Sequence, residues 1–132
     1  MASEKPQICR GGCACGAVRY ELHGDMGFSF HCQCRSCQYL SGTGHASAFI
    51  GKKEALNWSG DLTWYERPAP SGNVVKSGFC PVCGTHVFNR NTGHDDIVFI
   101  TASTLDDPSV FQASKVLYRD EGHDWDFVDP EA

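Results

Sequence analysis

The chemically active side chains of this sequence are its cysteines. Thiolate sulfur is a preferred ligand of zinc, and closely spaced cysteines are typical of zinc sites. Seven of the eight cysteines fall into three short clusters, Cys13-Ala-Cys15, Cys32-Gln-Cys34-Arg-Ser-Cys37 and Cys80-Pro-Val-Cys83. This pattern predicts metal centres rather than disulfides.

The cluster Phe79-Cys-Pro-Val-Cys-Gly84 has the most specific spacing. Two residues between Cys80 and Cys83 let both sulfurs reach one ion, and Gly84 permits a turn that directs backbone N–H groups at the thiolates. We therefore predict a zinc knuckle here. The alternative is a redox-active pair of thiols.

The remaining clusters differ in how many ligands they offer. Residues two apart in an extended segment face the same side, so Cys13 and Cys15 can share an ion, although two buried strand cysteines have the same spacing. The simplest pairing completes the knuckle with this pair. It predicts one closed four-cysteine site, formed by Cys13, Cys15, Cys80 and Cys83.

The third cluster then has three ligands and one open position. Zinc with three protein ligands can bind and activate another molecule, whereas four ligands make a structural site. We expect the Cys32, Cys34 and Cys37 site to be open. Alternatively, one further side chain closes it, for which the candidates are His31, His45, His86 and Cys9.

A reaction at the open site also needs a proton donor. The candidates nearest in sequence are His31, Tyr39, Ser41 and His45, although each also has a purely structural explanation. Arg35 either attracts a substrate carboxylate or offsets the charge of the thiolates, and we favour the second reading. Cys9 is expected to be a packed small side chain, and His86 to be structural.

The elements that position these residues are predicted to be mainly β-strands. Alternating polar and apolar residues and turn formers indicate strands at Ala17–Leu22, Gly27–Phe30, Ala46–Ile50, Leu62–Tyr65, Asn73–Phe79, His86–Asn89, Ile97–Thr101 and Ser114–Tyr118. Single helical turns are expected at Lys52–Leu56 and Thr104–Asp107. We expect Trp58, Trp64 and Tyr118 to be core or sheet-face aromatics.

Length and charge limit the remaining possibilities. We interpret the 132 residues as one domain, residues 1–132, with a core at about 9–118 and an acidic tail at 119–132 whose Trp125 and Phe127 pack on the body. The net charge of −5 argues against nucleic-acid binding, and the apolar runs are too short to cross a membrane. The first ten residues lack the apolar core of a secretory signal, so we expect a cytoplasmic protein.

Several motifs together resemble one known family. They are GGCACGAVRYEL, HCQCRSCQYLSGTG, LNWSGDLTWY, SGFCPVCGTHVF and ITASTLDDP, in this order. The chain is similar over about Cys9 to Tyr118 to the glutathione-dependent formaldehyde-activating enzymes, whose domain also occurs in a centromere-associated protein. The resemblance implies a β-tent fold, which is built from coiled antiparallel sheets around zinc.

The resemblance also implies cofactors and an activity. Two zinc ions are implied, one structural on Cys13, Cys15, Cys80 and Cys83, and one catalytic on Cys32, Cys34 and Cys37. The implied activity is that of a carbon–sulfur lyase, in which glutathione and formaldehyde combine to form S-hydroxymethylglutathione. The small thiol and the aldehyde are then the partners, and the missing fourth ligand of the second zinc is the thiol itself.

Two other functions remain open at this point. In the first, both ions are structural and the surface of a non-enzymatic zinc module binds another protein. In the second, the chemistry is the same but another thiol replaces glutathione, because no cluster of Lys and Arg is visible for the glutathione carboxylates. The sequence does not indicate an oligomeric state.

Overall fold

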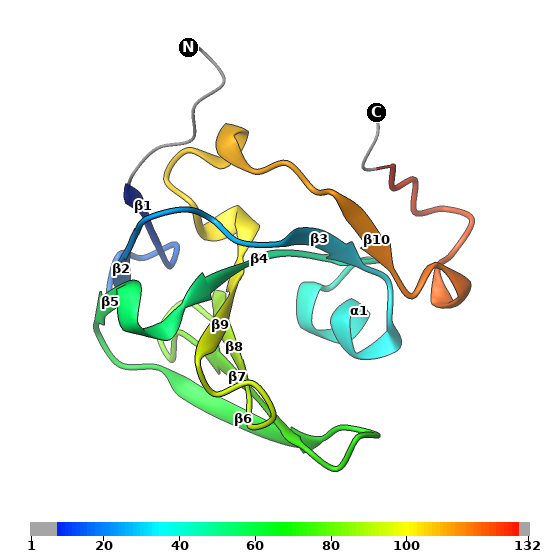
Figure 1. Cartoon of the computed structure of the whole chain (residues 1–132), viewed down its shortest axis with the longest axis horizontal. Helices are drawn as coiled ribbons and strands as arrows, with labels where there is room; N and C mark the ends of the chain where they lie inside the picture. The colour runs from blue at the N-terminus through cyan, green and yellow to red at the C-terminus, as the bar shows by residue number, and fades with distance from the viewer. Residues whose placement is uncertain (1–7, 130–132) are drawn as a thin grey trace.

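Two β-sheets make up most of the chain in a computed structural model, which describes residues 8–129 (Figure 1). Most of the N-terminal stretch used to predict the localisation, and the last three residues of the tail, lie outside the described residues. The smaller sheet is antiparallel, with strand order β1-β2-β5, and consists of β1 (Ile8–Gly12), β2 (Arg19–His23) and β5 (Leu56–Ser59).

The larger sheet has the strand order β10-β3-β4-β9-β8-β7-β6. Its neighbouring strands are antiparallel except for the parallel pair of β10 and β3. The strands are β3 (Ser29–Cys32), β4 (Ala46–Lys52), β6 (Thr63–Pro68), β7 (Val74–Phe79), β8 (His86–Asn91), β9 (Ile97–Thr101) and β10 (Lys115–Leu117). These strands confirm the expected mainly β architecture.

Helical structure is short. The described residues contain one α-helix, α1 (Arg35–Ser41), and the 3-10 turns η1 (Lys53–Ala55), η2 (Ala102–Thr104), η3 (Pro108–Val110) and η4 (Arg119–Glu121). The sequence predicted neither α1 nor the strands β1 and β5, and it placed the second helical turn at 104–107 rather than at η2. Seven residues are too few to show a helical period, and Cys34 at the N-cap is not among the usual capping residues.

The core lies between the two sheets. Leu22 on β2 and Ile100 on β9 are both almost fully buried. Gly51 on β4 lets them approach, because a Cβ there would lie 2.8 Å from Leu22 and 3.2 Å from Ile100. Tyr20 and Phe88 continue the contact, with ring centroids 5.4 Å apart. Cys9 is 3% exposed within the same cluster, so the expectation that it is a packed side chain is confirmed.

The aromatic residues follow the predictions only in part. Tyr118 was expected in the core or on a sheet face, but it follows β10 and is 58% exposed. Trp58 and Trp64 are half-exposed on sheet faces, where Trp58 packs on Phe88 at a centroid distance of 5.7 Å. The tail prediction was wrong, since Trp125 and Phe127 are 62% and 92% exposed. Trp125 stacks instead on the neighbouring His123, at 4.9 Å. Over residues 8–129, no helix has the length and apolarity that a membrane span requires.

Candidate metal centres and the cavity between them

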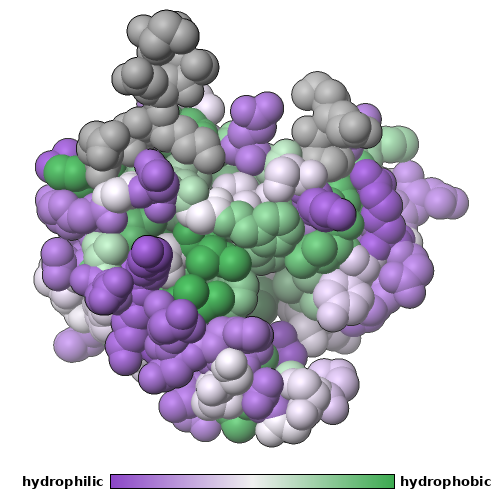
Figure 2. Space-filling model, viewed as in Figure 1, coloured by the Kyte–Doolittle hydropathy of each residue, from purple (hydrophilic) through white to green (hydrophobic). Residues whose placement is uncertain are grey.

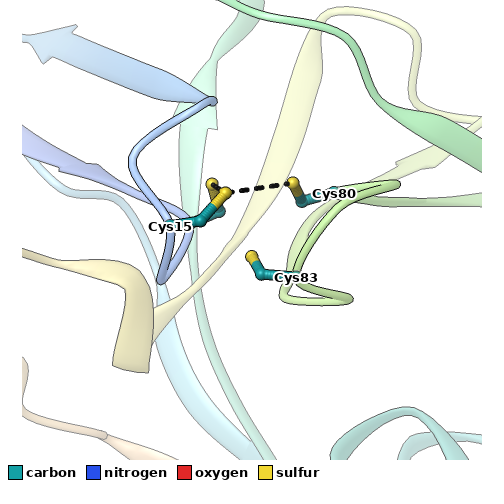
Figure 3. Close-up of side chains that lie close together, drawn as sticks. Cys15, Cys80 and Cys83 are labelled. Carbon is teal, nitrogen blue, oxygen red and sulfur yellow. Dashed lines mark hydrogen bonds between the residues drawn. The ribbon is translucent and has the colours of Figure 1, made fainter.

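The first candidate metal centre joins two loops that lie far apart in the sequence. The sulfurs of Cys13, Cys15, Cys80 and Cys83 all lie within 4.8 Å of one another. The loop between β1 and β2 supplies the first two, and the loop between β7 and β8 supplies the others. The labelled side chains in Figure 3 point toward a common centre, and the Cys15 and Cys80 sulfurs are 3.8 Å apart.

Backbone groups hold the loop between β7 and β8 in shape. The Cys80 N–H bonds to the Thr85 carbonyl at 2.9 Å, and the Gly84 N–H bonds to the Cys80 carbonyl at 2.8 Å. Gly84 has φ +79°, a conformation that side chains rarely adopt. The Val82 N–H donates to the Cys80 sulfur at 3.4 Å. The turn predicted from Gly84 is therefore present, with a backbone amide directed at a sulfur.

Thr85 and backbone N–H groups of the loop between β1 and β2 form further hydrogen bonds around the sulfurs. The Val18 N–H donates to the Cys13 sulfur at 3.2 Å, and the Ala14 N–H donates to the Thr85 hydroxyl at 3.1 Å. Hydrogen bonding by Thr85 lowers the pKa of Cys83 to about 5. These donors stabilise the thiolate form, which is the form that binds metal.

The spacing of the four sulfurs fits a tetrahedral metal. Zinc–sulfur bonds of about 2.3 Å put the sulfurs of a tetrahedron about 3.8 Å apart. The Cys13 and Cys15 sulfurs are 3.6 Å apart and those of Cys15 and Cys80 are 3.8 Å apart. Four thiolates leave no coordination position free, so this cluster fits a structural ion.

The second candidate centre is built around the start of α1. Cys32 ends β3, Cys34 is the N-cap residue of α1, and Cys37 lies in its first turn. Their three sulfurs also lie within 4.8 Å of one another. The Cys34 sulfur accepts the Cys37 N–H at 3.4 Å, and Gly42 ends the helix with φ +72° and an N–H bond to the Gln38 carbonyl. The helix thus brings Cys37 back toward Cys32.

The three sulfurs compete for protons. Hydrogen bonds from Cys32 and then Cys37 lower the pKa of Cys34 to about 2, and the hydrogen bond to Cys34 raises the pKa of Cys32 to about 11. The pKa of Cys37 is raised through its hydrogen bonds with Cys32 and Cys34. Three thiolates so close together repel one another, and a cation between them removes this cost. The donor set therefore fits a thiophilic metal.

A cavity of about 700 Å³ opens beside the second cluster. Cys32, Cys34 and Cys37 line it on one side, and residues of β6, β7 and β8 line it on the other. Figure 2 shows the molecule in the same view as Figure 1. Hydrophobic side chains gather near the middle of the face in this view, and hydrophilic ones lie over the strands toward its lower rim. Its volume falls within the range of about 300 to 1,000 Å³ that is usual for small-molecule sites.

The side chains considered for closing the second cluster have other positions. Within residues 8–129, the group of metal-ligating side chains around Cys34 contains no histidine and no fourth cysteine. His31 bonds to Ser47 at 2.7 Å, His45 pairs with Asp126 at 2.9 Å, and His86 bonds to Asn89 at 2.9 Å. Among the described residues, the group therefore consists of three sulfurs, which line the cavity.

The four proton donors suggested by proximity in sequence do not line this cavity either. Tyr39 is 80% exposed, and its ring lies under the Arg35 guanidinium at 5.0 Å. Tyr118 and His86 occupy the cavity wall instead, together with Arg67 and Glu121. Burial lowers the pKa of His86, which keeps its ring neutral near pH 7. The sequence could not reveal these neighbours because they come from distant elements, namely β6, β8 and the turn η4.

The acidic tail holds α1 in place. The Glu121 carboxylate accepts the Arg35 N–H at 2.9 Å, and the Gln38 side chain donates to the Glu121 carbonyl at 3.1 Å. Asp126 accepts from Gln33 at 3.2 Å and pairs with His45. The tail thus supports the second cluster through polar contacts rather than through its aromatic residues.

Fold and sites together define a β-tent domain with two cysteine clusters able to hold metal. The model of the family described as glutathione-dependent formaldehyde-activating enzyme matches residues 8–121, so the chain belongs to this family. The match confirms the resemblance and the expected fold class.

A solved structure supports the same architecture. The chain is similar to a crystal structure of a Rhodobacter sphaeroides protein, with 21% identity and a TM-score of 0.63 over 81% of this chain and 98% of that chain. At this identity the likeness shows the fold alone. No curated protein matches the chain.

Proposed function

We propose that the protein is a carbon–sulfur lyase that adds a small thiol to an aldehyde, or reverses this addition. Glutathione and formaldehyde, which the family name supplies, are the first substrates to test. The observation that carries the proposal is the set of three sulfurs facing a cavity of about 700 Å³, where a structural site would have a fourth ligand.

The two clusters have separate roles in this proposal. Cys13, Cys15, Cys80 and Cys83 would hold a structural zinc, and Cys32, Cys34 and Cys37 a catalytic one. A zinc ion with one open position keeps a thiol in its nucleophilic thiolate form near neutral pH. Three protein thiolates make the second site better suited to a soft sulfur ligand than to polarising a carbonyl.

The addition of the thiol to the aldehyde involves no oxidation or reduction. The sulfur of the substrate forms a bond to the carbonyl carbon, and the π electrons of the carbonyl group move to its oxygen. The resulting alkoxide takes up one proton, while the thiol has lost one. A proton donor in the cavity wall therefore accelerates the step, by a typical factor of about 100 or more.

Tyr118 is the donor that the cavity wall favours. Its hydroxyl would give the proton to the alkoxide and regain one from solvent, which carries the proton lost by the thiol. Among the described non-glycine residues, Tyr118 is the one with positive φ, at +57°. This conformation costs about 1 to 2 kcal/mol for a side chain of this kind. Strain of this size at a cavity wall is typical of functional positions.

The apolar part of the wall has a second role. Phe30, Phe99 and Leu117 line the cavity together with alanines of β4. These side chains exclude water from the region beside the sulfurs, which strengthens the electrostatic effects on a developing alkoxide.

The experiment is exchange NMR on a mixture of glutathione and formaldehyde. The uncatalysed addition proceeds by itself, so the measured quantity is the acceleration by the protein over buffer. The matched control is Cys34→Ser, which leaves the four-cysteine cluster intact. We expect acceleration with the native protein and loss of it in the variant.

Other outcomes assign the function differently. Acceleration with another small thiol but not with glutathione would keep the lyase and change its substrate. The lyase proposal is overturned by two results together. The protein accelerates the exchange of no thiol with formaldehyde, and thiols leave the spectrum of the Co²⁺-substituted second site unchanged. The protein would then be the non-enzymatic zinc module.

A further inference from the structure

Arg67 is a charged residue that lines the cavity, and no protein group pairs with its guanidinium in the part of the chain that the structure describes. It lies on β6, is mostly buried, and lines the cavity opposite the second cysteine cluster. Its Nε is buried and makes no hydrogen bond within the part of the chain that the structure describes. A buried charged donor left unpaired is unfavourable, and an anionic ligand removes this cost.

The sheet register places polar side chains on the same sheet face as this guanidinium. Arg67 pairs with Val75 on β7, and Val75 pairs with Asn91 on β8. Cross-strand partners share one face of a sheet, and all three residues line the cavity. Asn89 lies two residues before Asn91 on the same face and lines it as well. The far wall thus offers a guanidinium and two amides, which together can bind a carboxylate.

Two other arginines show why Arg67 is distinctive. Arg90 also has a buried Nε without a partner, but its Nη2 bonds to Asp95 at 3.1 Å. Arg35 lines the cavity, but its guanidinium bonds to the Gln38 side chain and lies over Tyr39. Within residues 8–129, the structure gives the Arg67 guanidinium no such contact. It is therefore the arginine of the cavity wall that is available to a ligand.

The strand order separates the sulfurs of the second cluster from Arg67. Four strands separate β3, which ends at Cys32, from β6 in the sheet order. Five steps of about 4.8 Å amount to about 24 Å along the sheet. Cys32 at the end of β3 and Arg67 on β6 nevertheless line one cavity. A substrate that reaches both has its anionic group several bonds away from its sulfur.

We propose that Arg67, with Asn89 and Asn91, binds a carboxylate of the thiol substrate and thereby selects peptide-like thiols with a carboxylate remote from the sulfur. The inference rests on the proposed function for the identity of the sulfur ligand. It supplies the carboxylate-binding group that the sequence did not reveal as a cluster of Lys and Arg. Small neutral thiols would enter the cavity but lack this contact.

The test is a binding measurement in the absence of aldehyde, so that it does not depend on turnover. NMR titration of the metal-loaded protein gives the dissociation constants of glutathione and of glutathione diethyl ester. In the diethyl ester, both carboxylates are esterified and uncharged. We expect the native protein to prefer the free acid by about 10- to 100-fold, which corresponds to the loss of a charge-assisted hydrogen-bond pair. Shifts of the Asn89 and Asn91 side-chain amides should accompany binding of the acid.

Variants at two arginines of the larger sheet, on β6 and β8, provide the control. Arg67→Gln should abolish the preference, and Arg67→Lys should restore part of it, because lysine keeps the charge without the planar fork. Arg90→Gln should keep the native preference, since Arg90 is paired with Asp95. Metal content and far-UV circular dichroism show whether each variant is folded.

The outcomes separate this inference from the proposed reaction. It is overturned if the native protein binds acid and ester equally, or if folded Arg67→Gln retains the preference. An Arg67-dependent preference without acceleration of any thiol exchange would support the carboxylate site and contradict the lyase. Acceleration of exchange with no Arg67-dependent preference would support the lyase and contradict the carboxylate site.

Discussion

The two cysteine clusters differ in the number of their cysteines and in how far apart these lie along the chain. The four-cysteine cluster joins loops whose cysteines lie 65 positions apart, and it offers four candidate metal ligands. The three-cysteine cluster spans residues 32–37 and faces a cavity. Closing a long loop stabilises a fold, whereas leaving one position open makes room for chemistry. The comparison predicts that stability and activity depend on different cysteines.

Removing a ligand from the four-cysteine cluster should have the largest effect. Cys80 is fully buried, and its sulfur faces that of Cys15. Cys80→Ser is expected to lower the free energy of unfolding by about 4 kcal/mol or more, because metal binding and folding are coupled here. Urea denaturation with metal analysis measures this. Cys9→Ala, at a buried cysteine outside both clusters, should keep the full metal content, and native-like stability of Cys80→Ser would contradict the structural role.

Removing a ligand from the three-cysteine cluster should separate activity from stability. Serine is a good N-cap residue, so Cys34→Ser preserves the cap of α1 while removing one sulfur. We expect a loss of the second ion, loss of thiol exchange, and a decrease in unfolding free energy of about 1 to 2 kcal/mol, close to that of an ordinary substitution. The same denaturation and metal analysis apply. A decrease as large as that of Cys80→Ser would remove the distinction between the clusters.

The proton donor allows a finer test of the open site. Tyr118→Phe should lower kcat by about 100-fold with little change in KM, because only the hydroxyl is lost. Tyr39→Phe is the matched control, since Tyr39 is largely exposed and outside the cavity wall. Steady-state kinetics with glutathione and formaldehyde give both parameters. Equal activity of Tyr118→Phe and native protein would assign the proton to another group.

The tail contacts should affect the open site more than the closed one. The Asp126 side chain is 8% exposed and is bonded to His45 and Gln33. Asp126→Asn is expected to lower the free energy of unfolding by about 1 to 2 kcal/mol through the weakened pair, and to speed hydrogen exchange in α1. Exchange at Val82 and Gly84 in the four-cysteine cluster should change little. Asp124→Asn, an exposed neighbour, is the control, and equal exchange changes at both clusters would argue against a local role.

The smallest effect is expected at the rim of the four-cysteine cluster. Arg19 bonds to Asp106 at 2.9 Å, and this hydrogen bond lowers the pKa of the Asp106 carboxyl group. A lowered pKa stabilises the fold above the usual carboxyl pKa, and the contribution is lost as the pH falls through the folded-state pKa. Because both side chains are about half exposed, Asp106→Asn should cost less than about 1 kcal/mol. The urea midpoint of the variant should differ from that of the native protein more at pH 7 than at pH 3, because the contribution decreases below the ordinary carboxyl pKa.

Sequence spacing was informative where neighbouring residues share a task. The Cys80 and Cys83 spacing and Gly84 predicted a turn that the structure contains, and β9 matches its expected range of 97–101. Helix α1 was missed because its capping group is the sulfur of Cys34. The cavity wall was missed for a different reason. Arg67 and Asn91 come to line one cavity only through the order of β6, β7 and β8, which spacing does not encode.

The tail errors have a similar cause. Trp125 and Phe127 were expected to be the anchoring residues because aromatic side chains are usually buried. In the structure, Asp126 between them makes the contacts to the body. A polar anchor of this kind depends on the position of His45 and Gln33, which is set by the fold. The sequence pattern alone favours the larger hydrophobic side chains.

The parallel pairing of β10 with β3 also determines the order in which the protein can be completed during synthesis. The last sulfur of the four-cysteine cluster belongs to Cys83, so this cluster has all its ligands before the final third of the chain has left the ribosome. Cys32 lies beside Leu117 in the β3–β10 pair, and α1 is held by residues from Glu121 to Asp126. Domains fold as the chain emerges from its N-terminal end. During synthesis, all four cysteines of the first cluster are therefore present before the residues that pair with β3 and hold α1.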